Sequence, residues 1–145
     1  MRRTAPRQRL EQLRTIPLFA SCSDKDLAQV DGLVDDHAVT KGTVLAEQGT
    51  PARQAFIILD GRADVTIDGK TIAHLGTGDT FGEMALLSKP VELRSATVTA
   101  KTDMQLLVLE PRCFNALVEM PCVAKRLLGK LSDRLRDTDE AVVNG

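Results

Sequence analysis

The feature that most constrains the fold of this chain is a series of short β-branched runs separated by glycine turns. The turn signals are Lys41-Gly42, Gln48-Gly49, Asp60-Gly61, Asp68-Gly69 and Gly76-Thr77-Gly78-Asp79. Asp68-Gly69 stands between VTI and KTIAHL and predicts a β-hairpin, because the favoured two-residue loop needs residues that tolerate positive φ. Many short strands joined by such turns predict a sandwich or a barrel between His37 and Glu110.

Helical periodicity is found toward the two ends of the chain. Arg7–Arg14 carries leucines three positions apart, and Ser23 precedes an acidic turn, which predicts a second helix capped by Ser23. Pro111 suits the first position of a later helix, and Pro121 breaks or restarts it. The order predicts an α+β fold, with an all-β core between N-terminal and C-terminal helices.

Composition bounds the kind of protein. The 145 residues suit one domain, and the net charge of -1 and the absence of Trp and Tyr argue against a nucleic-acid surface. No run approaches the roughly 18 apolar residues of a membrane span. The three cysteines, Cys22, Cys113 and Cys122, form no CxxC pair. They argue against a disulfide framework or a zinc site and suit a reducing cytosol, so we expect a cytoplasmic protein that needs no metal and no cofactor.

FGEMALL, Phe81 to Leu87, interrupts the strand pattern with good helix formers. We expect one or two turns of helix here, beginning at Gly82. The N-terminus of a helix offers unpaired N–H groups and a partial positive charge, which attract anions. Because Gly82 has no side chain, an anion could approach its backbone closely.

Arg94 follows this segment, and its guanidinium fork matches two oxygens of a phosphate. The small residues Ser95 and Ala96 could add backbone donors. Glu83 would repel a phosphate but could accept hydrogen bonds from the hydroxyls of a sugar. These residues therefore indicate a sugar-phosphate site. A plain salt bridge between Glu83 and Arg94 explains them equally well from the chemistry alone.

The wider pattern resembles the cyclic nucleotide-binding domain family, the domain type of the catabolite activator protein and of the regulatory subunits of cAMP-dependent protein kinase. The resemblance covers about residues 10–140. The matching elements, in order, are IPLF at Ile16–Phe19, Gly42, Glu47-Gln48-Gly49, IILDG at Ile57–Gly61, Gly76, Gly78-Asp79, FGEMALL and RSATV. In kinase-type members proline usually stands right before the arginine, whereas here Leu93 does and SKPVEL lengthens the loop.

The resemblance implies one domain over 1–145. An eight-stranded, jelly-roll-like β-roll with N-terminal helices would occupy about 10–110, with a phosphate-binding cassette at 81–97, and helices would fill 111–142. It also implies that Glu83 binds the ribose 2′-hydroxyl and that Arg94 binds the cyclic phosphate. The remaining phosphate contacts would come from Gly82, Met84, Ala85, Ser95 and Ala96. Arg53 is a weaker candidate for a second positive charge.

The resemblance also bears on which nucleotide is bound. Members that prefer cGMP often carry Thr after the arginine, and Ser95 stands there instead, so we expect cAMP, with cGMP as the alternative. A residue of the last helix often covers the base. The apolar stripe Val123, Leu127, Leu128, Leu131 and Leu135 could supply it, with Leu131 and Arg134 as the candidates. Core packing or a dimer seam explains the stripe more readily.

We therefore predict a cyclic nucleotide sensor that signals by moving its C-terminal helices, and not an enzyme. Its partner would be a second copy of the chain or an effector protein. Three alternatives remain: the same fold without a nucleotide, serving as an interaction or dimerisation module; part of a transcription factor of the catabolite activator type, for which AVVNG ends the chain before any helix-turn-helix; and a fragment of another larger protein, such as a channel or an enzyme.

Overall fold

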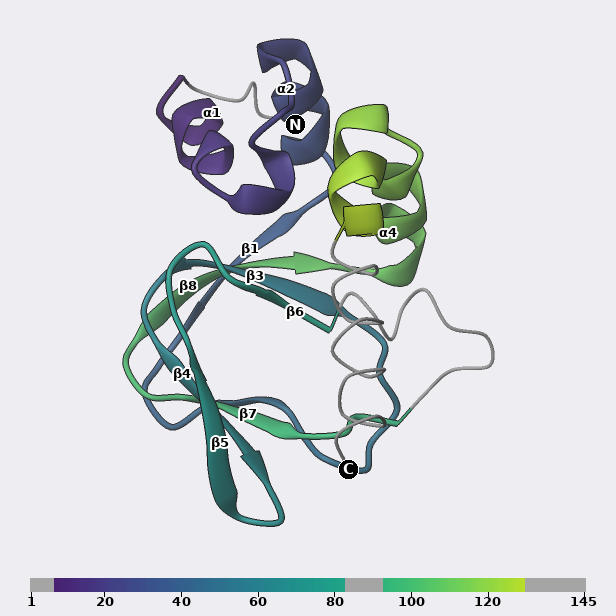
Figure 1. Cartoon of the computed structure of the whole chain (residues 1–145). Helices are drawn as coiled ribbons and strands as arrows, with labels where there is room; N and C mark the ends of the chain where they lie inside the picture. The colour runs from purple at the N-terminus through teal and green to yellow at the C-terminus, as the bar shows by residue number, and fades with distance from the viewer. Residues whose placement is uncertain (1–6, 83–92, 130–145) are drawn as a thin grey trace. The chain divides into compact units, whose positions relative to one another are not determined.

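The computed structural model describes residues 7–82 and 93–129 (Figure 1). The chain divides into two compact units. One unit, here called the helical unit, combines Met1–Asp31 with Asn115–Gly145; the other, here called the β unit, is Gly32–Phe114. The single domain over 1–145 stays a prediction.

The β unit is a roll of two four-stranded sheets that face each other (Figure 1). One sheet has the order β1-β8-β3-β6 and the other β2-β7-β4-β5, with every pairing antiparallel. The strands within the described ranges are β1 (Asp35–Val39), β2 (Val44–Ala46), β3 (Ala55–Asp60), β4 (Ala63–Ile67), β5 (Lys70–Leu75), β6 (Thr80–Phe81), β7 (Thr97–Ala100) and β8 (Met104–Leu109). The predicted eight-stranded β-roll with helices at both ends of the chain is confirmed.

The core of the β unit lies between the two sheets. Phe56 and Ile58, at alternate positions of β3, belong to this core, and Val98 and Ala100 of β7 join it from the other sheet. Successive strand side chains point to opposite faces, so alternate residues share one face. Burial of this apolar surface is the main stabilising contribution to the roll.

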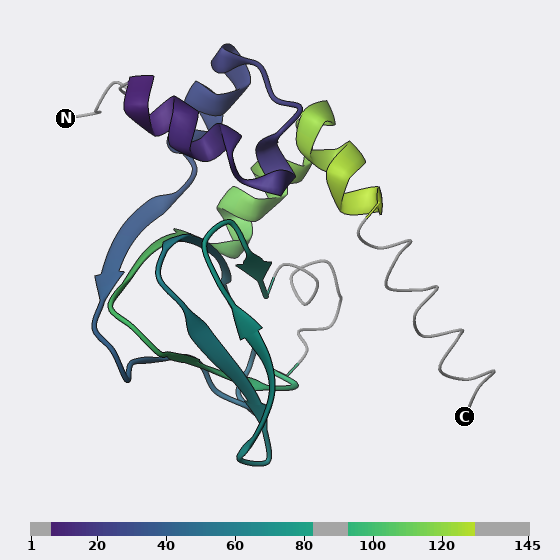
Figure 2. The same ribbon diagram turned by 60° about the vertical axis from the view of Figure 1, so that its left-hand side comes forward.

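The hairpin at Asp68-Gly69 forms as predicted between β4 and β5. Asp68 has φ 53° and Gly69 has φ 80°, the positive values that a two-residue loop of this kind requires. Figure 2 shows the hairpin extending beyond the rest of the β unit. Its tip is held by Gln48, which donates to Asp68 Oδ1 at 3.1 Å and accepts from the Asp68 backbone N–H at 2.9 Å.

The N-terminal segment of the helical unit contains α1 (Arg7–Arg14), the 3-10 helix η1 (Pro17–Phe19) and α2 (Asp24–Asp31). Helices α1 and α2 pack side by side (Figures 1 and 2). Ser23 caps α2 as predicted: its Oγ accepts from the Asp26 N–H at 3.2 Å, and Asp26 Oδ2 accepts from the Ser23 N–H at 3.2 Å. This reciprocal pair satisfies two backbone donors.

Helix α4 (Pro111–Val118) starts at the predicted proline, with its first four residues in the β unit and the rest in the helical unit, and a second helical stretch covers 121–129. Val123 and Leu127 are buried, but Leu128 is 64% exposed. Successive helical residues are about 100° apart, and here Leu127 faces the core while Leu128 does not. Core packing therefore explains Val123 and Leu127 but not Leu128, the dimer seam stays a prediction, and Leu131 and Leu135 lie outside the described residues. No helix within the described ranges has the length and apolar character to cross a membrane.

A disulfide corrects the prediction made from the cysteines. Cys22 and Cys122 are joined, with their Cα atoms 5.2 Å apart, and Cys113 is a free thiol. Beside the disulfide, Arg126 donates to Ser21 Oγ from Nε at 3.3 Å and from Nη2 at 3.1 Å. The pairing was missed because the two cysteines are separated by 100 positions, and only the folded helical unit brings them together.

Candidate ligand-binding site

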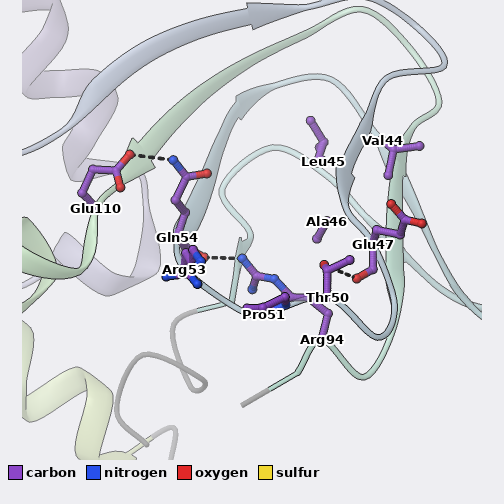
Figure 3. A pocket seen from close by; sticks show the side chains of 10 residues that line it. All are labelled: Val44, Leu45, Ala46, Glu47, Thr50, Pro51, Arg53, Gln54, Arg94 and Glu110. Atoms are coloured by element: carbon purple, nitrogen blue, oxygen red, sulfur yellow. Dashed lines mark hydrogen bonds between the residues drawn. The ribbon is translucent and has the colours of Figure 1, made fainter. Parts of the chain in front are cut away.

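A pocket of about 520 Å³ opens in the β unit (Figure 3). It combines an apolar wall from β2 with polar and charged side chains of both signs. The lining residues are Val44, Leu45, Ala46, Glu47, Thr50, Pro51, Arg53, Gln54, Arg94 and Glu110. A mixed lining of this kind suits a small ligand with an apolar part and a charged part.

The backbone of Arg94 is fixed by pairing with residues 49–51. The Arg94 N–H donates to the Thr50 carbonyl at 2.7 Å, and the Gly49 N–H donates to the Arg94 carbonyl at 2.8 Å. Leu93 forms an isolated β-bridge with Pro51. Arg94 therefore reaches the pocket in a defined register, with Leu93 directly before it.

The guanidinium of Arg94 is half-buried and points at the start of β3 (Figure 3). Its Nη2 donates to the Gln54 carbonyl at 2.7 Å, and its Cζ lies 5.9 Å from the centre of the Phe56 ring. Burial lowers the pKa of Arg94 below its ordinary value, because desolvation disfavours the charged form. A cation that has lost part of its hydration gains from a bound anion, so the site favours a negatively charged group.

Gly82 allows the guanidinium to lie against the backbone. A Cβ at this position would stand 2.7 Å from Arg94 Nη1 and 2.8 Å from the Gln54 carbonyl oxygen. Its φ of 85° also favours glycine. Gly82 lies in a bend and not in a helix, so the expected helix does not begin at this residue. The close approach that the glycine permits is made here by the arginine of the same chain.

The other predicted site residues are placed only in part. Ser95 is exposed and Ala96 is half-buried in the bend that leads from Arg94 into β7. The predicted cassette residues Glu83, Met84 and Ala85 lie outside the described residues, and so do the candidate base-covering residues Leu131 and Arg134. The alternative salt bridge between Glu83 and Arg94 falls outside them as well.

Sequence reasoning missed four polar residues of the pocket, Glu47, Thr50, Gln54 and Glu110. Gln54 Nε2 donates to Glu110 Oε1 at 2.6 Å (Figure 3). Gln54 directly precedes β3 and Glu110 directly follows β8, but the register that brings these strand ends together cannot be read from the chain. Arg53, named as a weaker candidate for a second positive charge, does line the pocket.

The β-roll and its arginine-lined pocket define the class of protein as a ligand-binding domain. Residues 37–120 match the family model of the cyclic nucleotide-binding domain. The chain belongs to the cyclic nucleotide-binding domain family.

Three relatives illustrate the similarity. The cAMP-dependent protein kinase regulatory subunit of Schizosaccharomyces pombe is 31% identical over 130 residues, which is 89% of this chain and 29% of that protein. The crystal structure of the Thermus thermophilus catabolite activator protein has a TM-score of 0.76 at 29% identity, covering 87% of this chain and 61% of that one. The regulatory domain of Toxoplasma gondii PKA, crystallised with cAMP, has a TM-score of 0.65 at 32% identity, covering 76% of this chain and 43% of that one. The chain thus spans less than a third of the curated kinase subunit it matches.

Proposed function

We propose that this chain is a regulatory domain that binds a cyclic nucleotide, cAMP in preference to cGMP, in the pocket of the β unit. The observation that carries the proposal is the half-buried Arg94 guanidinium, which lines the pocket and is held by the Gln54 carbonyl. One arginine fork suits the single negative charge of a cyclic phosphate. The apolar wall of Val44, Leu45 and Ala46 provides surface for the uncharged part of the ligand.

The roles of the individual residues follow from the family resemblance. Arg94 would bind the cyclic phosphate and Glu83 the ribose 2′-hydroxyl. The other phosphate contacts would come from Gly82, Met84, Ala85, Ser95 and Ala96. Leu131 or Arg134 would cover the base. Arg53, which lines the pocket, is a weaker candidate for a second positive charge. In these assignments, one short segment of chain supplies both a carboxylate that accepts a hydrogen bond from the ribose and the groups that donate hydrogen bonds to the phosphate.

The preference for cAMP rests on two points. Ser95 stands where members that prefer cGMP often carry Thr, and the Toxoplasma gondii relative, at 32% identity, was crystallised with cAMP. Ligand binding would move the C-terminal helices, and this movement would carry the signal to a second copy of the chain or to an effector protein. The protein would need no cofactor, would catalyse no reaction and would act in the cytoplasm.

A thermal-shift panel tests this proposal. At a concentration 100 times Kd, a ligand that binds only the folded state adds about 2.7 kcal/mol. For a domain of this size that raises Tm by roughly 5 to 10 °C. We expect the largest shift with cAMP, a smaller one with cGMP, and less still with 5′-AMP or a cyclic dinucleotide. If no cyclic nucleotide moves Tm, the fold serves as an interaction module instead.

A further inference from the structure

Gln54 and Glu110 lie where the ladder between β3 and β8 ends. The ladder pairs Ala55 with Leu109, and both strands stop at these residues. Gln54 and Glu110 are the next two residues outward, and their side chains are joined by the hydrogen bond of 2.6 Å. Side chains that face each other across a strand pair interact, so this bond extends the pairing beyond the last backbone pair.

The backbone of Gln54 is in turn the partner of Arg94. Its carbonyl accepts the hydrogen bond from Arg94 Nη2 at 2.7 Å, and Gln54 itself belongs to no strand. Gln54 thus contacts Glu110 with its side chain and the Arg94 guanidinium with its carbonyl. A guanidinium has five N–H groups, so four remain for other acceptors when one is given to Gln54.

Glu110 continues the connection into α4. Its carbonyl accepts from the Phe114 N–H at 2.9 Å, which is the first hydrogen bond of that helix. Three hydrogen bonds thus connect the Arg94 guanidinium through Gln54 and Glu110 to the first turn of α4. Figure 3 shows the two that join Arg94, Gln54 and Glu110. All of these residues belong to the β unit.

We propose that Gln54 is a positioning residue for Arg94 and that Glu110 links this residue to the first turn of α4. An anion held by Arg94 and the order of that turn then influence each other, since coupling between two sites is reciprocal. The link deepens the proposed function and rests on it wherever a nucleotide is involved. Its ligand-free part, the aiming of Arg94, stands by itself.

The ligand-free part is tested by NMR of the Arg94 guanidinium in the full chain. In the wild-type protein we expect hindered rotation and resolved Nη signals, because the fork is held. In Gln54→Ala and Glu110→Ala the guanidinium should rotate more freely, so that its Nη signals merge into an average. Glu110→Gln keeps an acceptor oxygen and should preserve the separate signals. Glu119→Ala removes a carboxylate just after α4 and is the matched control. Unchanged Arg94 signals in Glu110→Ala, with the fold intact by circular dichroism, would contradict the positioning role.

The ligand part is tested by cAMP affinity and by hydrogen exchange. We expect Gln54→Ala and Glu110→Ala each to weaken cAMP binding about 3- to 10-fold, the range that one net hydrogen bond covers. The double variant should bind cAMP no more weakly than either single variant, because both substitutions remove the same contact. Added cAMP should slow exchange at the amides of the first turn of α4 in wild type, Glu110→Gln and Glu119→Ala, but not in Glu110→Ala.

The two parts separate failure of the link from failure of the proposed function. If wild-type protein binds no cyclic nucleotide, the proposed function is wrong, while the NMR result still decides the role of Gln54. If cAMP binds and slows exchange in Glu110→Ala as much as in wild type, the link to α4 is wrong and the proposed function stands.

Discussion

Replacing Arg94 with alanine is expected to weaken cAMP binding by at least about 30-fold. Hydrogen bonds to charged groups are worth about 1.5–3 kcal/mol each, and a bidentate fork makes two of them to one phosphate. The loss is the larger because the guanidinium is half-buried, where water competes less for the phosphate. The cAMP affinity of Arg94→Lys should lie between those of the wild type and Arg94→Ala, since lysine keeps the charge and loses the fork. Competition against a fluorescent cAMP analogue measures all three.

Arg62→Ala is the matched control for this comparison. Arg62 is an exposed arginine between β3 and β4 and does not line the pocket, so its removal changes the net charge equally without touching the site or α4. We expect its cAMP affinity to match wild type. The Tm of the unligated variants shows whether they fold. If folded Arg94→Ala binds cAMP as tightly as the wild type does, Arg94 does not bind the phosphate.

Reduction of the Cys22–Cys122 disulfide is expected to destabilise the protein by about 3 to 5 kcal/mol. The two cysteines are separated by 100 positions, and cross-linking a loop of that length removes about 4.7 kcal/mol of chain entropy from the unfolded state at 25 °C. Denaturant unfolding with and without a thiol reductant gives the difference directly. Cys122→Ser should reproduce the reduced value and no longer respond to reductant.

Cys113→Ser supplies the control, because Cys113 is a free thiol. That variant should stay sensitive to reductant to the same extent as wild type. Equal stability of the oxidised and reduced wild-type protein, or three reactive thiols in protein kept from reductant, would contradict the pairing. The disulfide also removes the cysteine argument for a reducing compartment, and the cytoplasmic location stays a prediction without that support.

The elements that could be predicted from the sequence are those set by local chemistry. Asp68 and Gly69 specify their turn through their own tolerance of positive φ, and Ser23 caps α2 through a residue only three positions away. Pro111 begins α4 for a similarly local reason. Arg94 could be singled out because its guanidinium fork matches two oxygens of a phosphate, and the family resemblance then favoured this role over a plain salt bridge.

What could not be predicted depends on contacts between distant parts of the chain. Gln54 meets Glu110 only because β3 pairs with β8 in one register, and Cys22 meets Cys122 only within the folded helical unit. Core packing holds for Val123 and Leu127 but not for the exposed Leu128, because apolar spacing alone does not say how much of a stripe faces the core. The expected phosphate contact of Gly82 stays a prediction, but its closeness to the Arg94 guanidinium could not be foreseen, because it too depends on how distant parts of the chain fold together.

Calorimetric titration of the wild-type chain and of Arg94→Ala with cAMP tests the central claim most directly. The predicted result is one saturable site per wild-type chain, with a binding heat that Arg94→Ala loses or shifts to at least about 30-fold higher concentration, as two charge-assisted hydrogen bonds require. The absence of any saturable heat from the wild-type chain with both cAMP and cGMP would contradict it.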